Sequence, residues 1–222
     1  MTSDPTETPL YASPPCFAHE LDDAEPAPTL SPAEVAAWRK DRRAALIAAR
    51  LAVPAAERQH CAAEIAGHLD QFVNPGPGMI VSLYWPFRGE LDLRGWMAEA
   101  HGKGARIALP LVEAMGRPLV FREWWPGCAM ERGVWNIPNP SGTPVVTPSV
   151  VIAPLVGYDT ACYRLGYGGG FFDRTLATLS PRPMVIGVGH ACAAMATIHP
   201  QPHDIPMDVI LAGGGRVISR TA

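Results

Sequence analysis

The chain has 222 residues, of which 48% are hydrophobic and 18% are charged, a composition typical of a globular protein with one sizeable core. Its formal net charge is −3, but six of the 21 acidic residues lie in residues 1–30, which contain no lysine or arginine. The remaining residues carry 18 basic groups against 15 acidic ones, a mild bias that suits a small polyanionic ligand and argues against a nucleic-acid surface.

The cysteines and the hydropathy pattern indicate where the protein resides. Five cysteines, widely spaced and never arranged as Cys-x-x-Cys, are typical of reduced thiols in a reducing compartment. The sequence has no basic segment followed by an apolar run at its start, and no uninterrupted apolar stretch of about eighteen residues. We therefore expect a cytoplasmic protein that binds neither nucleic acid nor membrane. The oligomeric state does not follow from these features, and our expectation for it is a monomer or weak homodimer.

The first expected elements are a tail and two helices. Residues 1–30 combine prolines and acids with few large apolar groups, which predicts a disordered acidic tail followed by one domain over residues 31–222. Ser31-Pro32-Ala33-Glu34 supplies an N-cap, a first-turn proline and a glutamate at the third helical position, so a helix should run from here to about Arg50. A second helix is expected over residues 55–72.

Beyond residue 78 the sequence pattern changes to short apolar runs separated by turn residues. Strands are predicted over residues 79–84, 106–109, 119–122, 150–153, 184–188, 209–211 and 217–219. Helical patterns over residues 91–103 and 171–179 lie between some of these runs, which favours an α/β domain with a largely parallel sheet. The continuously apolar run 184–188 is typical of a central strand covered on both faces.

A glycine-dense segment with flanking charges is the most informative part of the chain. Residues 164–174 read Arg-Leu-Gly-Tyr-Gly-Gly-Gly-Phe-Phe-Asp-Arg and lead into a predicted helix. Glycines accept positive φ, so several backbone N–H groups can turn towards one anion, and a helix start adds its positive dipole end. Arginine forks suit phosphate oxygens, and Asp173 suits the magnesium ion that accompanies a nucleoside triphosphate. The segment predicts a phosphate site, whereas glycines alone would indicate only a turn.

Other nucleotide and metal motifs are missing or ambiguous. The sequence has no Gly-x-x-x-x-Gly-Lys-Ser/Thr loop, no dinucleotide fingerprint and no kinase signature. Two prolines interrupt the spacing between His199 and His203, which argues against a helical metal pair. Asp204 and Asp208 either supply oxygen ligands for magnesium or lie in a solvated turn.

Two further segments have patterns suited to ligands. Basic residues within 39–43, with Arg50 two turns later, form either a solvated helix face or the completion of charge around a triphosphate. Tyr84-Trp-Pro-Phe-Arg-Gly-Glu90 follows a predicted strand, where α/β proteins commonly place ligand loops. Its rings and carboxylate suit a flat heterocycle that carries N–H donors. Other aromatic side chains belong either to the same wall or to the core: Trp124, Trp125 and Trp135.

Together these segments resemble the 5-formyltetrahydrofolate cyclo-ligase family, also called 5,10-methenyltetrahydrofolate synthetase. The resemblance covers about residues 35–213 and is most specific over 159–174, which is similar to the family pattern Phe-Asp-x-x-Gly-x-Arg-Leu-Gly-x-Gly-x-Gly-Tyr-Tyr-Asp-Arg. Supporting matches are the basic start of the first helix, Tyr84-x-Pro86-x-x-x-Glu90, Leu109-Pro110, Ile137-Pro138-x-Pro140 and Asp204-x-x-x-Asp208.

The resemblance implies a fold and a reaction. The fold would be α/β, a three-layer α/β/α sandwich with a mostly parallel sheet that also resembles the sugar-phosphate isomerase and CoA-transferase-like fold. Residues 31–222 would be one cyclo-ligase-like catalytic domain. Its reaction would be the ATP- and Mg-dependent conversion of 5-formyltetrahydrofolate, a reduced formyl-folate, into 5,10-methenyltetrahydrofolate, with release of ADP and phosphate. Phosphorylation of the formyl oxygen would activate a formamide carbon that is otherwise a poor electrophile.

The resemblance also implies roles for individual residues. Arg164 and Arg43 would be catalytic, and Asp173 and Asp204 would ligate magnesium. ATP would contact Arg39, Arg43, Arg164, Leu165, Gly166, Tyr167, Gly168, Gly169, Gly170, Phe171 and Phe172. The formyl-folate would contact Trp85, Glu90, Tyr167, Gly168, Gly169, Gly170 and Phe171, with Arg43 also reaching it.

Several positions depart from the family pattern. Arg39 stands where lysine is usual, Cys162 replaces a glycine, Asn139 replaces a glutamate, and Phe171 and Phe172 replace paired tyrosines. A glutamine usually found after the strand 184–188 is also missing. These departures concentrate near the folate, so the alternatives are a paralogue that uses ATP on another small heterocyclic amide, or a non-catalytic nucleotide-binding protein.

Overall fold

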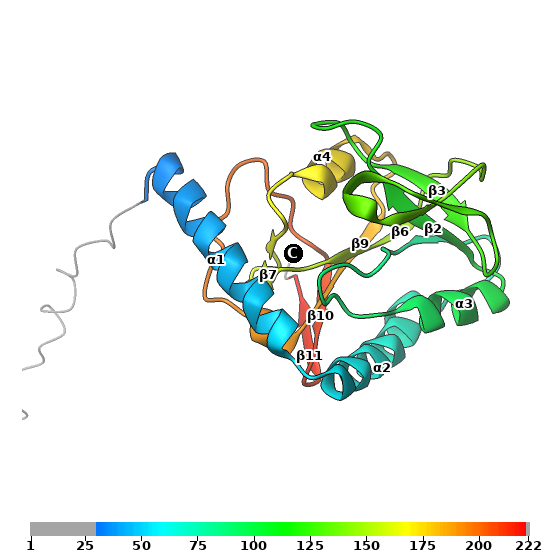
Figure 1. Ribbon diagram of the computed structural model, residues 1–222, viewed down its shortest axis with the longest axis horizontal. Helices are drawn as coiled ribbons and strands as arrows, with labels where there is room; N and C mark the ends of the chain where they lie inside the picture. Colours follow the sequence, from blue (N-terminus) through cyan, green and yellow to red (C-terminus); the bar gives the residue numbers. More distant parts are fainter. Residues whose placement is uncertain (1–29, 221–222) are drawn as a thin grey trace, which may run out of the picture.

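A seven-stranded sheet forms the centre of the structure, a computed structural model that describes residues 30–220 (Figure 1). Its strand order is β11-β10-β9-β6-β1-β2-β3, and neighbours run parallel except in the edge pairs β10–β11 and β2–β3. The strands are β1 Ile80–Ser82, β2 Arg106–Leu111, β3 Val120–Trp124, β6 Val150–Pro154, β9 Met184–Gly189, β10 Val209–Ala212 and β11 Arg216–Ser219. The predicted α/β class with a mostly parallel sheet is confirmed, and each predicted strand is present.

Helices cover both faces of this sheet. Helices α2 (Ala55–Val73) and α3 (Arg94–Gly102) pack on one face, and α4 (Phe171–Thr178) packs on the other. Side chains of β6 alternate between the two cores, because Val150 and Ile152 join the α2 and α3 side while Val151 and Ala153 join the α4 side. Burial on both faces explains why the central strands read as continuous apolar runs.

Helix α1 (Pro32–Ala52) lies beside the sheet, next to the short strand β7 (Gly157–Tyr158) and the short 3-10 helix η3 (Ala191–Ala193) (Figure 1). It begins with the predicted capping box, in which the Ser31 hydroxyl accepts the Glu34 N–H and Glu34 Oε2 accepts the Ser31 N–H at 2.7 Å. The spacing of Arg39, Arg43 and Arg50 brings them to one face of the helix, where each makes hydrogen bonds outside α1.

Short elements missing from the sequence prediction complete the site region. A hairpin is formed by β4 (Met130–Arg132) and β5 (Pro138–Pro140), joined through η2 (Val134–Asn136), and a second pair by β7 (Gly157–Tyr158) and β8 (Arg164–Leu165). Strands of two or three residues are too short to show an alternating pattern, so their pairing depends on tertiary contacts.

The structure differs from the sequence prediction at the start of α3, and most of the predicted tail lies outside the described residues. The helix expected from Leu91 begins at Arg94, because Leu91 and Leu93 are buried in the preceding loop and the Asp92 carboxylate accepts the Arg94 N–H at 3.1 Å. The expected disordered tail, residues 1–30, lies outside the described residues except for Leu30. Across residues 30–220, no helix is both long and apolar enough to cross a membrane.

Candidate functional site

A cavity of about 360 Å³ opens where β1, β2 and β6 end at their carboxyl ends. Parallel sheets commonly bind ligands at this edge, because the loops after neighbouring strands converge there. The lining includes every residue to which the family resemblance gave a role: Arg39, Arg43, Trp85, Glu90, Arg164, Leu165, Gly166, Tyr167, Gly168, Gly169, Gly170, Phe171, Phe172, Asp173 and Asp204. Segments up to 165 residues apart in the chain therefore meet around one space.

The glycine-rich loop, residues 166–170, links β8 to α4 and forms one wall of the cavity. Gly168 and Gly170 have positive φ of 98° and 61°, which other residues rarely adopt. A Cβ on Gly169 would lie 2.6 Å from the Phe171 ring. Gly170 is the N-cap of α4, and no side chain among the described residues caps the amides of this first turn. The loop thus presents free backbone N–H groups at a helix start, an arrangement suited to phosphate.

Ion pairs place four charged groups beside this loop. Arg164 Nη2 donates to Asp173 Oδ2 at 3.0 Å, and Arg39 pairs with Asp204 through both terminal nitrogens. Arg43 Nε donates to the Gly166 carbonyl at 2.8 Å. Burial raises the pKa of Asp204, but hydrogen bonds from Arg39 and from a backbone N–H outweigh it and hold the pKa below its usual value. The Asp204 carboxylate therefore faces the cavity in its charged form.

Arg164 retains an unused donor inside the wall. Only 7% of its surface is exposed, and its Nε is buried without a hydrogen-bond partner among residues 30–220. A buried donor without a partner costs free energy of about 1–3 kcal/mol. An anion bound at the glycine-rich loop would remove that cost, so the donor set fits a phosphate group.

The carboxylates near the loop fit a metal only if another ligand completes the shell. Asp173 Oδ1 accepts the Ile205 N–H at 3.3 Å, which brings Asp173 beside the chain neighbour of Asp204. No group of three or more His, Cys, Asp or Glu side chains within the described residues is placed to hold a metal. Magnesium commonly takes one or two carboxylates and completes its shell with phosphate oxygens and water, so this pair fits a metal that arrives with a nucleotide.

Of the other ligand candidates near Asp204, Asp208 and His199 lie outside the cavity and His203 borders it. Asp208 Oδ1 accepts from Arg182 Nη1 at 2.8 Å and its Oδ2 accepts from a backbone N–H, so it does not line the cavity. The rings of His199 and Trp38 meet edge to face at 4.6 Å, whereas His203 is exposed at the cavity edge. Of the two aspartates that the sequence singled out here, only Asp204 belongs to the site.

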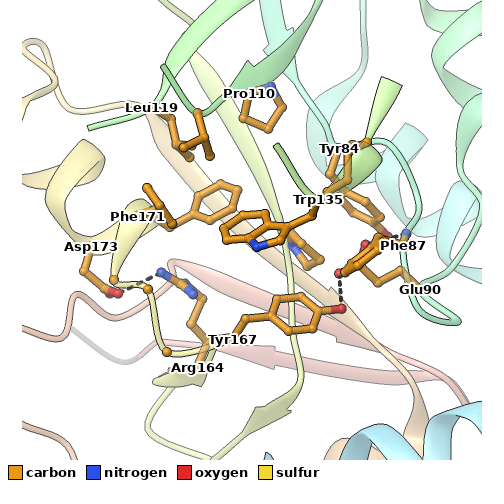
Figure 2. A pocket seen from close by; sticks show the side chains of 18 of the residues that line it. Tyr84, Phe87, Glu90, Pro110, Leu119, Trp135, Arg164, Tyr167, Phe171 and Asp173 are labelled. Atoms are coloured by element: carbon orange, nitrogen blue, oxygen red, sulfur yellow. Dashed lines mark hydrogen bonds and ion pairs between the residues drawn. The ribbon is translucent and has the colours of Figure 1, made fainter. Parts of the chain in front are cut away.

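The opposite side of the cavity holds Glu90 within an aromatic wall (Figure 2). Its Oε2 accepts the Phe87 N–H and its Oε1 accepts the Tyr167 hydroxyl, both at 2.9 Å. Burial raises the Glu90 pKa to about 7, although Arg50 and these hydrogen bonds act in the opposite direction. Trp85 and Phe87 line the same side, so a flat heterocycle with N–H donors finds both an aromatic surface and an acceptor there.

Of the three uncertain tryptophans, only Trp135 lines this cavity. It belongs to η2 with φ of 56°, and its ring meets the Phe171 ring edge to face at a centroid distance of 5.8 Å. Figure 2 shows it across the middle of the cavity, between Phe171 and Phe87. Trp124 instead belongs to the core on the α2 side, and Trp125 does not contribute to the lining.

The departures from the family pattern have definite positions. Cys162 is buried with φ of 65°, the left-handed conformation expected at a glycine position, and lies outside the cavity. Asn139, Phe171 and Phe172 all line the cavity, with Asn139 only 4% exposed. With Arg39, which also lines the cavity, four of the substitutions therefore change the surface that a ligand contacts.

Sequence reasoning left several contributors to the site without a role. Arg50 does not line the cavity, but its guanidinium donates a hydrogen bond to the Tyr167 hydroxyl. The sequence feature that could have indicated this role is the helical spacing that puts Arg50 on the same face of α1 as Arg39 and Arg43. The apolar wall was given no role, although the matches to the family pattern at Tyr84, Leu109-Pro110 and Ile137-Pro138 were a signal for part of it. Its residues come from separate loops and strand ends: Tyr84, Leu109, Pro110, Val112, Leu119, Ile137, Pro138 and Pro154.

Comparisons with known proteins agree with the motifs. Residues 35–213 match the model of the 5-formyltetrahydrofolate cyclo-ligase family. A 5-formyltetrahydrofolate cyclo-ligase of Mycolicibacterium smegmatis is 32% identical over 178 residues, which are 76% of this chain and 90% of that protein. One from Haemophilus influenzae is 25% identical over 166 residues, 70% of this chain and 88% of that protein.

Solved structures show the same fold. The NMR structure of Aquifex aeolicus 5,10-methenyltetrahydrofolate synthetase superposes with a TM-score of 0.70 at 24% identity, covering 83% of this chain and 93% of that one. A 5,10-methenyltetrahydrofolate synthetase from Mycoplasma pneumoniae gives a TM-score of 0.62 at 21% identity, covering 78% and 96%. With the family match over most of its length, this chain belongs to the 5-formyltetrahydrofolate cyclo-ligase family.

Proposed function

We propose that this protein converts 5-formyltetrahydrofolate into 5,10-methenyltetrahydrofolate with the hydrolysis of ATP to ADP and phosphate. Family membership supports the reaction. The observation that carries the proposal is the cavity itself, which has a phosphate-type glycine loop and arginines on one side and a half-buried carboxylate with aromatic rings on the other (Figure 2). Such a cavity can bind ATP at one end and the formyl-folate at the other, so that the γ-phosphate and the formyl group meet between them.

The nucleotide binds at the glycine-rich loop. Backbone N–H groups of residues 165–172 surround the phosphates, and Arg39, Arg43 and Arg164 neutralise their charge. Asp173 and Asp204 would hold the magnesium ion, which when bound would shield the phosphate oxygens and the charge that develops on them. The ion pairs that these carboxylates make with Arg164 and Arg39 orient the side chains before the nucleotide arrives.

The formyl-folate binds at the opposite side. Trp85 packs against its pterin ring, and Glu90 accepts the ring and amino N–H groups. Tyr167 to Phe171 line the junction, where the formyl group meets the terminal phosphate. Arg43 is close to both substrates because it lines the cavity and donates a hydrogen bond to the Gly166 carbonyl.

The site performs the reaction by alignment and charge neutralisation. The formyl oxygen attacks the γ-phosphorus, and the bond to the ADP oxygen breaks. N10 of the folate then adds to the activated formyl carbon, the carbon–oxygen bond breaks, phosphate departs and the N10 proton is released to solvent. Arg164 and Arg43 stabilise the charge that builds on the transferred phosphoryl group, so the chemistry needs no nucleophilic side chain.

The formation of methenyl-folate tests the proposal directly. Purified protein incubated with 5-formyltetrahydrofolate and Mg-ATP is expected to produce the methenyl-folate absorbance band. One phosphate should be released for each molecule of methenyl-folate formed. The control omits ATP and should show no band. Folded protein that binds ATP but produces no band would contradict the proposal and favour the paralogue that acts on another heterocyclic amide. Absence of phosphate release with any such amide would favour a non-catalytic binding protein.

The Glu90 pKa of about 7 predicts a pH dependence. Only the ionised carboxylate accepts N–H donors without a competing proton, so its protonation below pH 7 should weaken formyl-folate binding. We expect kcat/KM for 5-formyltetrahydrofolate to fall about tenfold per pH unit well below pH 7 and to level off above it. In Glu90→Gln this acidic limb should disappear from the measured profile, and its persistence there would assign the titration to another group.

Several broader features accompany this proposal. We infer that residues 31–222 act as one catalytic domain in the cytoplasm, as a monomer or weak homodimer that binds small molecules and neither nucleic acid nor membrane. Helices on both faces of the mostly parallel sheet support a three-layer α/β/α sandwich. They also support the resemblance to the sugar-phosphate isomerase and CoA-transferase-like fold, from which no chemistry is carried over.

A further inference from the structure

Arg50 is a buried cation in the last turn of α1, only 3% exposed, and the proposed chemistry does not use it. Its guanidinium donates to the Arg88 carbonyl at 2.9 Å, to the Leu155 carbonyl at 3.4 Å and to the Tyr167 hydroxyl at 2.5 Å. Burying a charge is costly unless its hydrogen bonds are satisfied, so this fork fixes three separate segments relative to one another.

The Tyr167 hydroxyl connects the two sides of the cavity. It accepts from Arg50 and donates to Glu90 Oε1, and its ring lies 5.6 Å from the Arg50 guanidinium carbon. Tyr167 is the one residue in the loop 166–170 that is not glycine. Glu90, the carboxylate proposed to bind the pterin, is therefore hydrogen bonded to Tyr167, a side chain of the glycine-rich loop (Figure 2).

This connection matters because the loop is conformationally permissive. Glycines lose much backbone freedom when a ligand orders them. Arg43 holds the Gly166 carbonyl and Arg174 holds the Gly169 carbonyl, both near the phosphate side, whereas Tyr167 holds the loop from the Glu90 side. A ligand that fixes Glu90 also fixes Tyr167, so a second ligand at the loop has less ordering entropy to lose.

We propose that Arg50 and the Tyr167 hydroxyl link Glu90 to the glycine-rich loop, so that the nucleotide and the formyl-folate each strengthen binding of the other. Arg50 is thus a positioning residue that acts through Tyr167. The inference rests on the proposed function, because it takes Glu90 as the pterin contact and the loop as the phosphate contact. Linkage requires the effect to be reciprocal, with the same factor for either substrate.

Calorimetric titration of the full chain with a non-hydrolysable ATP analogue and magnesium tests the link. The Kd of the analogue is measured with and without saturating 5-formyltetrahydrofolate. In the wild type we expect the folate to tighten analogue binding at least about fivefold, the lower end of typical couplings. Tyr167→Phe removes one hydroxyl from a partly exposed side chain, and its coupling factor should fall to about one. Arg50→Lys keeps the positive charge but loses the branched guanidinium donor, and it should also reduce the coupling factor, the ratio of the Kd values without and with folate.

Tyr163→Phe is the matched control, since Tyr163 lies just outside the loop and does not line the cavity. It should keep the wild-type factor. A wild type that forms methenyl-folate but shows the same Kd with and without folate overturns the link alone, as does a Tyr167→Phe variant with undiminished coupling. A wild type that binds the analogue but not the folate overturns the proposed function, and the link with it. A loss of packing alone would weaken analogue binding without changing the ratio of the two Kd values.

Discussion

Arg164→Gln is expected to lower kcat for methenyl-folate formation by about 10³-fold or more. Arginines that stabilise a transferred phosphoryl group contribute on the order of 10³ to 10⁵ in kcat. Arg164 has the position for this role, because it lines the cavity beside the glycine-rich loop, pairs with Asp173 at 3.0 Å and keeps a buried Nε free of protein partners among the described residues. Glutamine retains hydrogen-bonding ability but loses the charge and the fork. Steady-state assays at saturating substrates measure the effect.

Two controls separate this loss from unfolding. Removing Arg164 leaves the largely buried Asp173 without its ion-pair partner, so the thermal unfolding midpoint must be measured for the variant. Arg164→Lys keeps the charge beside Asp173 and should recover part of kcat. Arg182→Gln removes an arginine that pairs with Asp208 away from the cavity, and it should leave kcat unchanged. A folded Arg164→Gln variant with nearly wild-type kcat would contradict the assignment.

Glu90→Gln is expected to raise KM for 5-formyltetrahydrofolate by about 10²-fold. Charge-assisted hydrogen bonds contribute about 1.5–3 kcal/mol each, and an amide also places an N–H donor against the N–H donors of the pterin. The effect should be much smaller on KM for ATP, because Glu90 lies across the cavity from most of the glycine-rich loop and, within residues 30–220, is hydrogen bonded to that loop through Tyr167 alone. Initial rates with each substrate varied separately measure the two constants.

The matched control is Glu64→Gln. Glu64 accepts one backbone N–H, from Gly214 at 3.0 Å, and does not line the cavity, so this variant should keep both KM values. If Glu90→Gln raised KM for ATP as much as KM for the folate, Glu90 would be a support for the whole site and its proposed pterin contact would be wrong.

Local signals in the sequence predicted the elements well. The capping residues of α1 lie next to one another in the chain, and the apolar runs of the central strands reflect burial on both sheet faces, so both appear in a linear reading. The start of α3 was wrong because Leu91 and Leu93 continue the apolar pattern while they are buried in a loop. Short pairs such as β7 with β8 form through contacts that no short window contains.

The sequence by itself determined the α/β class and the groups that form the proposed phosphate side, because that side comes from one continuous segment, residues 164–173, whose glycines and charges have direct physical meanings. Only the tertiary structure decided which distant groups join it. It separated Asp204 from Asp208, selected Trp135 from three tryptophans, and connected Arg50 to Glu90 through Tyr167. These outcomes depend on how α1, the loops after the strands and the β4–β5 hairpin pack around the sheet, and packing between distant segments leaves little periodic trace in the chain.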